Sequence, residues 1–336
     1  MRDPRRAPGL ALLTAVLGTA AALTSAAQPA VAAPLATSYV LEPTASPTPS
    51  VQVKASAWTY RRLDHPARIA VEDGRTRPVA VFTFGARTVN VRGSLRTFKE
   101  PATTSAVVRS RTRVRLLAQP FTGPVPVTWL KAQLTSKRRD VLRTALQYVT
   151  GAPTVRNSQG AVVSSDAGYG PIVNGSRQEG SDFNDYLGVS WAYPSGSDAP
   201  ESDQRGDLDC SGFVRMVFGF RFHVPMSLDT DQVDLPRRSA WMLASAPGVV
   251  TVPDTGKVPS TRRLAPGDLL FFDADTGDGA AVDHVAIYLG RDNHGDPRFV
   301  SSRKSVNGPT MGDAGGNSLL SGSGTYAHTW RAVRRI

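Results

Sequence analysis

The sequence contains a single cysteine, Cys210, among 336 residues. One cysteine cannot form an internal disulfide, and it cannot supply a cysteine-rich zinc or iron–sulfur site. Stability must therefore come from packing, and no metal or organic cofactor is implied. Charged residues make up only 20% of the chain and apolar residues 40%. This composition excludes a wholly disordered chain, and the length suggests about two domains at roughly 100 to 200 residues each.

Long hydrophobic runs are also missing. The longest apolar run, residues 10–23, spans about 14 residues, whereas the hydrocarbon core of a membrane requires about 20. This run follows an arginine-rich start and precedes the small residues 30–33, which is the layout of a secretory signal peptide. We expect a cleaved leader over residues 1–32 and a Pro/Ser/Thr-rich linker over residues 33–52. The mature protein would then be secreted without stable insertion into a membrane.

Charge is distributed unevenly along the chain. Residues 51–150 hold 19 basic and 5 acidic side chains, a net charge of +14, whereas residues 151–336 hold 17 and 21, a net charge of −4. Such asymmetry suggests that the first half meets an anionic partner. No helix-turn-helix, zinc-finger or aromatic stacking signature supports nucleic acid. Anionic cell-envelope polymers are the expected partner, and a basic strand face without a dedicated ligand is the alternative.

The first half of the chain has the pattern of β-strands separated by glycine turns. We expect a small, basic, β-rich antiparallel module over residues 53–130. Its predicted strands are residues 67–71, 78–84, 88–92 and 111–117.

The second half combines helical and strand patterns, which is typical of an α+β fold. We expect this domain to span residues 136–336, with a first helix over residues 138–149 capped by Ser136. Residues 152–206 are rich in Gly, Ser, Asn and Asp and too long for an ordinary connection, so we expect them to form a functional insertion or a wall of the site. The predicted strands are residues 268–273, 284–290, 298–303 and 326–336.

Cys210 lies between an acidic loop and an apolar set at helical spacing, which includes Phe213, Val214 and Val217. This setting predicts that the thiol occupies the first turn of a helix. The unpaired amides and the dipole there favour an anion and would lower the thiol pKa from about 8.5. The alternative is a buried cysteine that only fills the core.

His284 is the histidine with the most informative setting. It begins a strongly apolar strand, in which it alternates with Ala286 and Tyr288 on one face. A histidine there could act as a base for Cys210. The alternative is a strand-end residue that faces solvent.

Four sequence blocks then carry a resemblance. They are D-C-S-G-F-V at 209–214, L-P-R-R-S-A at 235–240, L-A-P-G-D-L-L-F-F at 264–272 and D-H-V-A-I-Y-L-G at 283–290. In this order they resemble the NlpC/p60 family of cell-wall cysteine peptidases. The resemblance implies a papain-like core with Cys210 as nucleophile and His284 as base. It also implies peptidoglycan stem peptides as substrate, cut between D-glutamate and a diamino acid, by an enzyme associated with the cell wall.

Two elements of the family pattern differ here. Where the family usually has a third polar residue, often histidine, this chain has Ser301, and a hydroxyl orients an imidazole less firmly; Asp273 is another candidate for that role. The tyrosine-bearing element before the cysteine is missing, and Tyr186 or Tyr193 could replace its tyrosine. By resemblance Asp209 and Ser211 contact the substrate's amine, and helix capping is their alternative role.

The leading hypothesis is a secreted peptidoglycan endopeptidase that uses Cys210, His284 and Ser301. A second hypothesis is an amidase or acyl-transferase of the same superfamily that acts on another envelope bond. A third is a catalytically inactive wall-binding protein, which the neutral Ser301 and the +14 charge of residues 51–150 favour.

Overall fold

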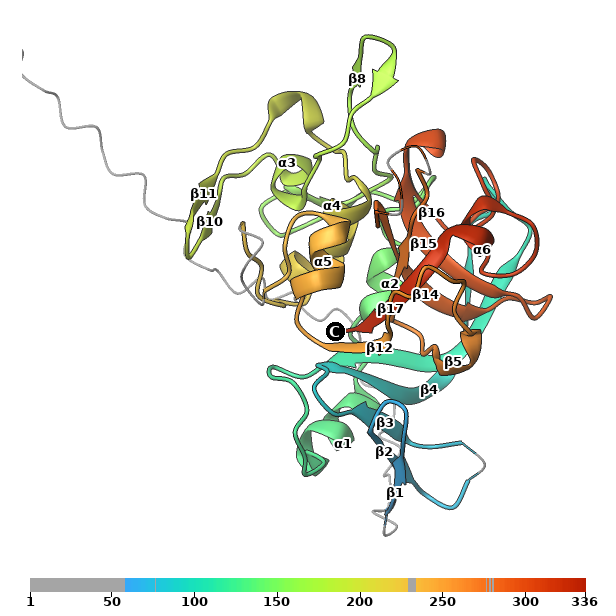
Figure 1. The fold of residues 1–336 in the computed structure, drawn as a ribbon. Helices are drawn as coiled ribbons and strands as arrows, with labels where there is room; N and C mark the ends of the chain where they lie inside the picture. Colours follow the sequence, from blue (N-terminus) through green and yellow to red (C-terminus); the bar gives the residue numbers. More distant parts are fainter. Residues whose placement is uncertain (1–57, 76, 229–233, 276, 278, 280) are drawn as a thin grey trace, which may run out of the picture. The chain divides into compact units, whose positions relative to one another are not determined.

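The computed structural model describes residues 58–336 except 76, 229–233, 276, 278 and 280. The expected leader and linker lie outside these residues, as does the start of the β-rich module. The described residues all belong to one compact unit. They form two larger antiparallel sheets, three small hairpins and short helices (Figure 1).

The first sheet contains five antiparallel strands paired in chain order. They are β1 (Thr59–Leu63), β2 (Arg68–Glu72), β3 (Ala80–Thr83), β4 (Thr88–Lys99) and β5 (Val107–Leu116). The four strands predicted in this half are confirmed by β2 to β5, and β1 has no predicted counterpart. Val71, Phe82 and Val89 are buried together with Leu130 of α1 (Val127–Thr135). The sheet therefore has an apolar core of its own.

The helix predicted over residues 138–149 is shorter, and its predicted cap is wrong. Ser136 follows the end of α1 rather than starting a helix. The observed helix, α2 (Val141–Ala145), begins after Asp140, whose carboxylate accepts a hydrogen bond from the N–H of Arg143 at 3.3 Å. Aspartate and serine are both good N-caps, and the contacts of Asp140 with the first sheet favour the aspartate.

The second sheet has six antiparallel strands in the order β12-β17-β13-β14-β15-β16. Their bounds are Val249–Val252 (β12), Trp330–Arg335 (β17), Leu269–Phe272 (β13), His284–Arg291 (β14), Pro297–Arg303 (β15) and Gly308–Thr310 (β16). The strands predicted at 268–273, 284–290 and 298–303 are confirmed. The prediction at 326–336 is wrong for its first part, because α6 (Thr325–Thr329) precedes β17.

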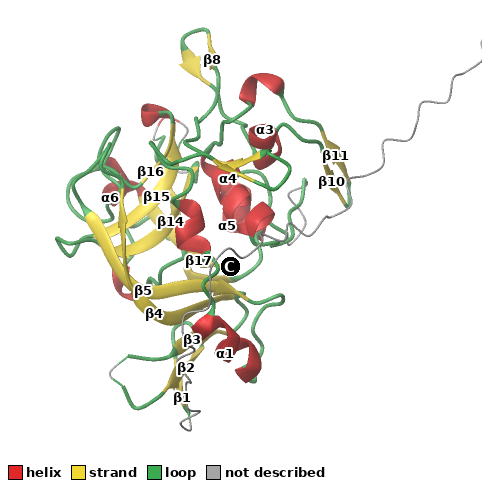
Figure 2. Cartoon of the chain, turned by 180° about the vertical axis from the view of Figure 1, so that it is seen from behind, coloured by secondary structure: helices red, strands yellow, loops and turns green. Residues whose placement is uncertain are grey.

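The two faces of this second sheet are both buried. On one face Val285 and Ile287 pack with the apolar residues of α4 (Cys210–Val214), which continues as a π-helix over Arg215–Arg221. α5 (Ser239–Ser245) lies on the same side (Figure 2). On the other face Ala286 and Tyr288 join a second apolar cluster. The alternation predicted for the strand that begins at His284 is therefore confirmed.

The segment predicted as an insertion, residues 152–206, consists of hairpins and short helices around α4. The hairpins are Val155–Arg156 with Val162–Ser164 (β6, β7), Ile172–Val173 with Ser176–Arg177 (β8, β9) and Trp191–Tyr193 with Gly196–Asp198 (β10, β11). The helices are α3 (Phe183–Leu187) and a 3₁₀ turn at Ser202–Gln204. Two further 3₁₀ turns, Thr261–Arg263 and Lys304–Val306, precede β13 and β16.

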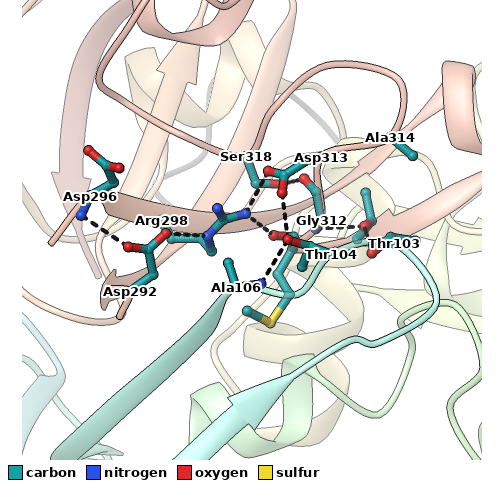
Figure 3. Close-up of polar contacts among 12 residues, drawn as sticks. Thr103, Thr104, Ala106, Asp292, Asp296, Arg298, Gly312, Asp313, Ala314 and Ser318 are labelled. Carbon is teal, nitrogen blue, oxygen red and sulfur yellow. Dashed lines mark hydrogen bonds and ion pairs between the residues drawn. The ribbon is translucent and has the colours of Figure 1, made fainter. Parts of the chain in front are cut away.

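Buried polar contacts join the two sheets. The β4–β5 connection reaches the loop after β16, where the Glu100 carboxylate accepts hydrogen bonds from Thr310 Oγ1 at 2.8 Å and from the N–H of Met311 at 2.7 Å. Figure 3 shows the neighbouring contacts, in which Asp313 accepts from Thr104 and from Arg298. The first sheet thus helps to hold a loop of the second half in place.

Candidate active site

Cys210 is the first residue of α4, as the sequence predicts. The preceding Asp209 caps this helix, because its carboxylate accepts hydrogen bonds from the N–H of Gly212 at 2.7 Å and from the hydroxyl of Ser211 at 2.8 Å. Its second oxygen accepts from the N–H of Gly180 at 2.9 Å. The capping role of Asp209 is therefore observed, and the Ser211 hydroxyl is part of the same cap.

The sulfur of Cys210 lies against the main chain on both sides of His284. Its thiol donates to the carbonyl of Asp283, with Sγ and O separated by 3.8 Å, and the N–H of Val285 also bonds to the sulfur. The Cys210 side chain is buried, with the residue 6% exposed. The fold thus brings the start of α4 and the start of β14 together. Among the described contacts there is no hydrogen bond between the Cys210 thiol and the His284 ring.

The expected lowering of the thiol pKa is not observed. Burial raises the pKa of Cys210 well above its usual value, and the negative charge of Asp209 adds to this effect. The bond from the Val285 N–H acts in the opposite direction but does not compensate. Desolvation disfavours the thiolate more strongly than the short helix start favours it. Cys210 is therefore a neutral thiol in this state of the protein.

His284 is buried beside two aromatic rings. The centroid of its ring lies 5.3 Å from that of Tyr326 and 5.8 Å from that of Phe272. Burial, and after it the positive charge of Arg303, lowers the pKa of His284 to about 3. Its Nε2 atom is buried without a hydrogen-bond partner in the described part of the chain. His284 is consequently a neutral imidazole, and the alternative of a solvent-facing ring does not hold.

The candidates for the third polar residue have other partners. The Oγ of Ser301 accepts a hydrogen bond from Arg303 Nε at 3.2 Å. Asp273 is paired with Arg331 at 3.2 Å. Neither side chain has a hydrogen bond to His284 among the described contacts.

Arg303 is a residue whose charge acts on His284 and which the sequence did not reveal. β14 and β15 pair Ile287 with Val300 and Tyr288 with Phe299. Continued by three residues, this register brings Arg303 opposite His284. Nothing in the local sequence distinguishes this arginine from the exposed ones, because its burial at 2% exposure depends on the loop after β16.

Three tyrosines have different surroundings in the insertion. Tyr186 bonds to Ser165 at 2.9 Å and packs against Tyr148, and Tyr193 accepts from the guanidinium of Arg215. Through these contacts Tyr186 and Tyr193 help to hold α4 in place. Of these three, Tyr169 is the one whose hydroxyl interacts electrostatically with Cys210, and Tyr326, outside the insertion, does so as well.

The two glycines that flank Tyr169 are the sequence feature that could have indicated its position. A Cβ atom on Gly168 would lie 1.9 Å from the carboxylate of Asp207, and one on Gly170 would lie 2.3 Å from the carbonyl oxygen of Gln178. At Gly170 the obstructing atom belongs to the main chain, so only glycine allows that approach, whereas at Gly168 the Asp207 side chain would have to move. These close approaches bring Tyr169 under the segment that leads to Cys210.

A pocket of about 450 Å³ opens beside the start of α4. Asp209, Ser211 and Gly212 contribute to its wall, together with acidic residues of the insertion and basic residues before α5. The other lining residues are Gly180, Asp182, Asp198, Glu201, Gln204, Leu228, Arg237, Arg238 and Trp241. Arg237 is held at 2.8 Å from Asp198 and 3.4 Å from Asp182. The pocket therefore offers both charge signs beside Asp209 and Ser211, the residues that flank Cys210, whereas Cys210 and His284 are not among its lining residues.

Comparison with known families agrees with this arrangement. Residues 190–309 match the NlpC/P60 family, and this part of the chain is an NlpC/P60 domain. Members of this family are generally cysteine peptidases or hydrolases that act on the cell wall. The matched segment contains Cys210 and His284.

Two further comparisons add little. A crystal structure of an NlpC/P60 family protein from Bacillus cereus ATCC 10987 aligns with 15% sequence identity over 82% of this chain and 78% of that chain, with a TM-score of 0.30. This similarity is too low to carry an argument. None of the curated proteins matches the sequence.

The described residues lack two further features, a metal-binding cluster and a membrane-spanning helix. They contain no group of three or more His, Cys, Asp or Glu side chains that could hold a metal ion. None of their helices has the length and apolar character that crossing a bilayer requires.

Proposed function

We propose that this protein is a peptidoglycan endopeptidase with Cys210 as nucleophile and His284 as base. The observation that carries the proposal is the contact of the Cys210 sulfur with the main chain around His284, inside a matched NlpC/P60 segment. A papain-like catalytic core accounts for a thiol at a helix start next to a strand that begins with histidine. The proposed substrate bond joins D-glutamate to a diamino acid in a stem peptide.

Because the Cys210 thiol and the His284 imidazole are both neutral, the first step of the reaction includes a proton transfer between them. His284 takes the proton from the Cys210 thiol as the sulfur forms a bond to the amide carbon. Amide groups at the start of α4, including that of Cys210, stabilise the negative charge that develops on the carbonyl oxygen. His284 must turn one ring nitrogen toward the sulfur for this transfer, because its present contacts are with Phe272 and Tyr326.

The remaining steps release the two products. The protonated His284 gives its proton to the leaving amine as the carbon–nitrogen bond breaks, which leaves an acyl group on Cys210. Water then attacks this thioester with His284 as base, and the carboxylate product leaves with the thiol restored. Ser301 supports this chemistry only indirectly, through its bond with Arg303.

The pocket beside α4 is the proposed binding site for the stem peptide. Asp209 and Ser211 would meet the ammonium group of the substrate, since both line the pocket. Asp209 would supply a buried carboxylate for this contact. Arg238 has a half-exposed side chain there and would meet a substrate carboxylate. Tyr186 does not line the pocket, and its contacts are with Ser165 and Tyr148.

The second candidate is an inactive wall-binding protein. The observation that favours it is the unpartnered Nε2 of His284 beside the positive charge of Arg303. A base whose Nε2 has no group to orient it, and whose pKa is low, transfers protons poorly.

The deciding experiment incubates purified muropeptides with the wild type and with Cys210→Ala, and measures the products by mass spectrometry. Release of fragments ending in D-glutamate by the wild type alone supports the peptidase. A product from a different amide or ester bond would point to the amidase or acyl-transferase alternative. Absence of products from a folded wild type would favour the inactive protein, and equal products from both would eliminate Cys210 as nucleophile.

Matched histidine variants sharpen this experiment. His284→Gln removes the proposed base, whereas His328→Gln alters an exposed histidine by the same chemistry. We expect loss of at least about 100-fold in rate for the first variant, in line with general acid–base catalysis, and no change for the second.

We further propose that the protein is secreted and acts at the cell wall, with residues 1–32 removed. Amino-terminal sequencing of the protein recovered from the culture medium tests this. A start near residue 33 supports cleavage, and an intact Met1 contradicts it.

A further inference from the structure

The first sheet carries a hollow that the proposed peptidase reaction does not use. Its volume is about 470 Å³, and five arginines and one leucine line it: Arg75, Arg77, Arg92, Arg109, Arg111 and Leu95. These residues come from the β2–β3 connection and from the β4–β5 pair. The hollow lies in the basic first half that the sequence predicts to meet an anionic partner.

A bulge between β4 and β5 shapes this hollow. The strands pair Arg92 with Thr112 and Arg96 with Ser110, so three residues of β4 lie opposite the single Arg111 of β5. Such a bulge bends the strand and increases its twist. It exposes Leu95, which is 54% accessible, among the arginines.

The hollow contains more positive charge than its surroundings neutralise. Asp73 is the acidic residue beside it, and it pairs with Arg92 and with Arg75. Arg92 also donates to the carbonyl of Arg77 at 2.8 Å, which fixes its orientation. The side chains of Arg77, Arg109 and Arg111 have no ion pair or hydrogen bond among the described residues. Three guanidinium groups are thus available next to one that is held in place.

Guanidinium groups bind phosphate oxygens through two parallel hydrogen bonds. Several of them along one hollow match a chain that carries a negative charge at every repeat. The lining has no aromatic ring for stacking and no Asn or Gln for reading a base edge, which sequence-directed or stacked binding of nucleic acid would use.

We propose that this arginine hollow binds the phosphodiester backbone of a polyol-phosphate polymer of the cell envelope. The choice of an envelope polymer rests on the cell-wall action of the NlpC/P60 family and not on the chemistry of Cys210. The hollow would retain the protein on the wall while the second half meets the stem peptide. A failure of the hollow to bind the polymer would therefore not count against the peptidase proposal, and a lack of peptidase activity would not count against polymer binding.

The test measures binding of the full chain to fluorescently labelled poly(glycerol phosphate) by anisotropy at several salt concentrations. The variant Arg109→Gln/Arg111→Gln removes two arginines that have no bonds to lose on folding. Its matched control, Arg138→Gln/Arg139→Gln, removes the same charge from two exposed arginines outside the hollow. A thermal melt of each variant verifies folding.

We expect the hollow variant to bind at least about tenfold more weakly, and its salt dependence to fall by roughly 0.7 in slope for each phosphate that the variant no longer neutralises. The control should stay within about twofold of the wild type. The variant Arg109→Lys/Arg111→Lys keeps the charge but loses the paired hydrogen bonds, so its affinity should lie between those of the wild type and the Gln variant.

Three results would overturn the proposal. The first is an equal loss of polymer affinity in the hollow variant and the control variant, which would show that only the net charge of the protein matters. The second is equally tight binding of polyglutamate of the same length, which would remove the preference for phosphate. The third is tighter binding of a single-stranded DNA oligomer that depends on Arg109 and Arg111, which would assign the hollow to nucleic acid.

Discussion

The guanidinium carbon of Arg303 lies 5.0 Å from the centroid of the Tyr326 ring. The centroid of the same ring lies 5.3 Å from that of His284. Arg303 donates to Ser301 and to carbonyl oxygens of the loop after β16. A buried cation, an aromatic ring and the proposed base therefore form one packed group. The cation disfavours a second positive charge on His284.

Replacing Arg303 by methionine should raise the pKa of His284 toward its usual value. Methionine fills much of the same space and removes the charge, whereas Arg303→Lys keeps the charge and should leave the pKa of His284 low. The pKa is measured by NMR titration of the labelled imidazole. An unchanged pKa in Arg303→Met would contradict the electrostatic role. Both variants lose buried hydrogen bonds, so we expect a loss of about 2–4 kcal/mol in the free energy of unfolding.

Alkylation of Cys210 should accelerate with pH without reaching a plateau below pH 9. Burial raises the thiol pKa, and the reactive thiolate then increases about tenfold for each pH unit. The rate constant with iodoacetamide between pH 6 and 9 tests this. A synthetic peptide of residues 207–213 provides the control, and the folded protein should react more slowly than this peptide at pH 8. A plateau below pH 7 would indicate an activated thiol instead.

The Asp140→Asn substitution should destabilise the protein by about 2–4 kcal/mol. Asp140 is 1% exposed, caps α2, accepts from the N–H of Val114 at 2.8 Å and pairs with Arg96. Asparagine retains the cap but leaves the Arg96 charge unpaired. Urea unfolding measures the effect.

The matched control for this substitution is Glu72→Gln, which removes an exposed pair with Arg61. Exposed ion pairs contribute about 0–1 kcal/mol. Equal effects of the two substitutions would show that the burial of Asp140 contributes nothing.

Stability of the insertion should decrease as pH rises from about 4 to about 7. Burial, and after it the neighbouring Glu201, raises the pKa of Asp185 to about 7. In the unfolded chain the pKa of an aspartate is about 3.9. The unfolded state therefore releases this proton first, which lowers the free energy of unfolding across that range. The melting temperature of Asp185→Asn, compared with the wild type from pH 4 to 8, isolates this contribution.

In the wild type, the melting temperature should fall relative to Asp185→Asn as pH increases. Asp64→Asn alters an exposed carboxylate and serves as the control. A difference between the wild type and Asp185→Asn that stays constant with pH would show that Asp185 does not titrate in this range.

Local features of the fold could be predicted from the sequence with good accuracy. The strands β2 to β5 and β13 to β15 follow apolar alternation, and Cys210 starts a helix because an acidic cap precedes an apolar helical pattern. The predicted helix cap at Ser136 is wrong because Asp140 meets Arg96 and Val114, which are distant in sequence. A cap that depends on partners from another sheet has no local signature.

By itself the sequence determined the reactive residue types and the elements that carry them, since helix starts and strand faces depend on neighbours within a few positions. Only the tertiary structure decided their chemical state. The register of β14 and β15 brings Arg303 near His284, and burial beneath the insertion raises the thiol pKa of Cys210. Desolvation and long-range charge depend on segments far apart in the chain, so the same motif can hold a neutral or an ionised cysteine according to what the fold packs around it.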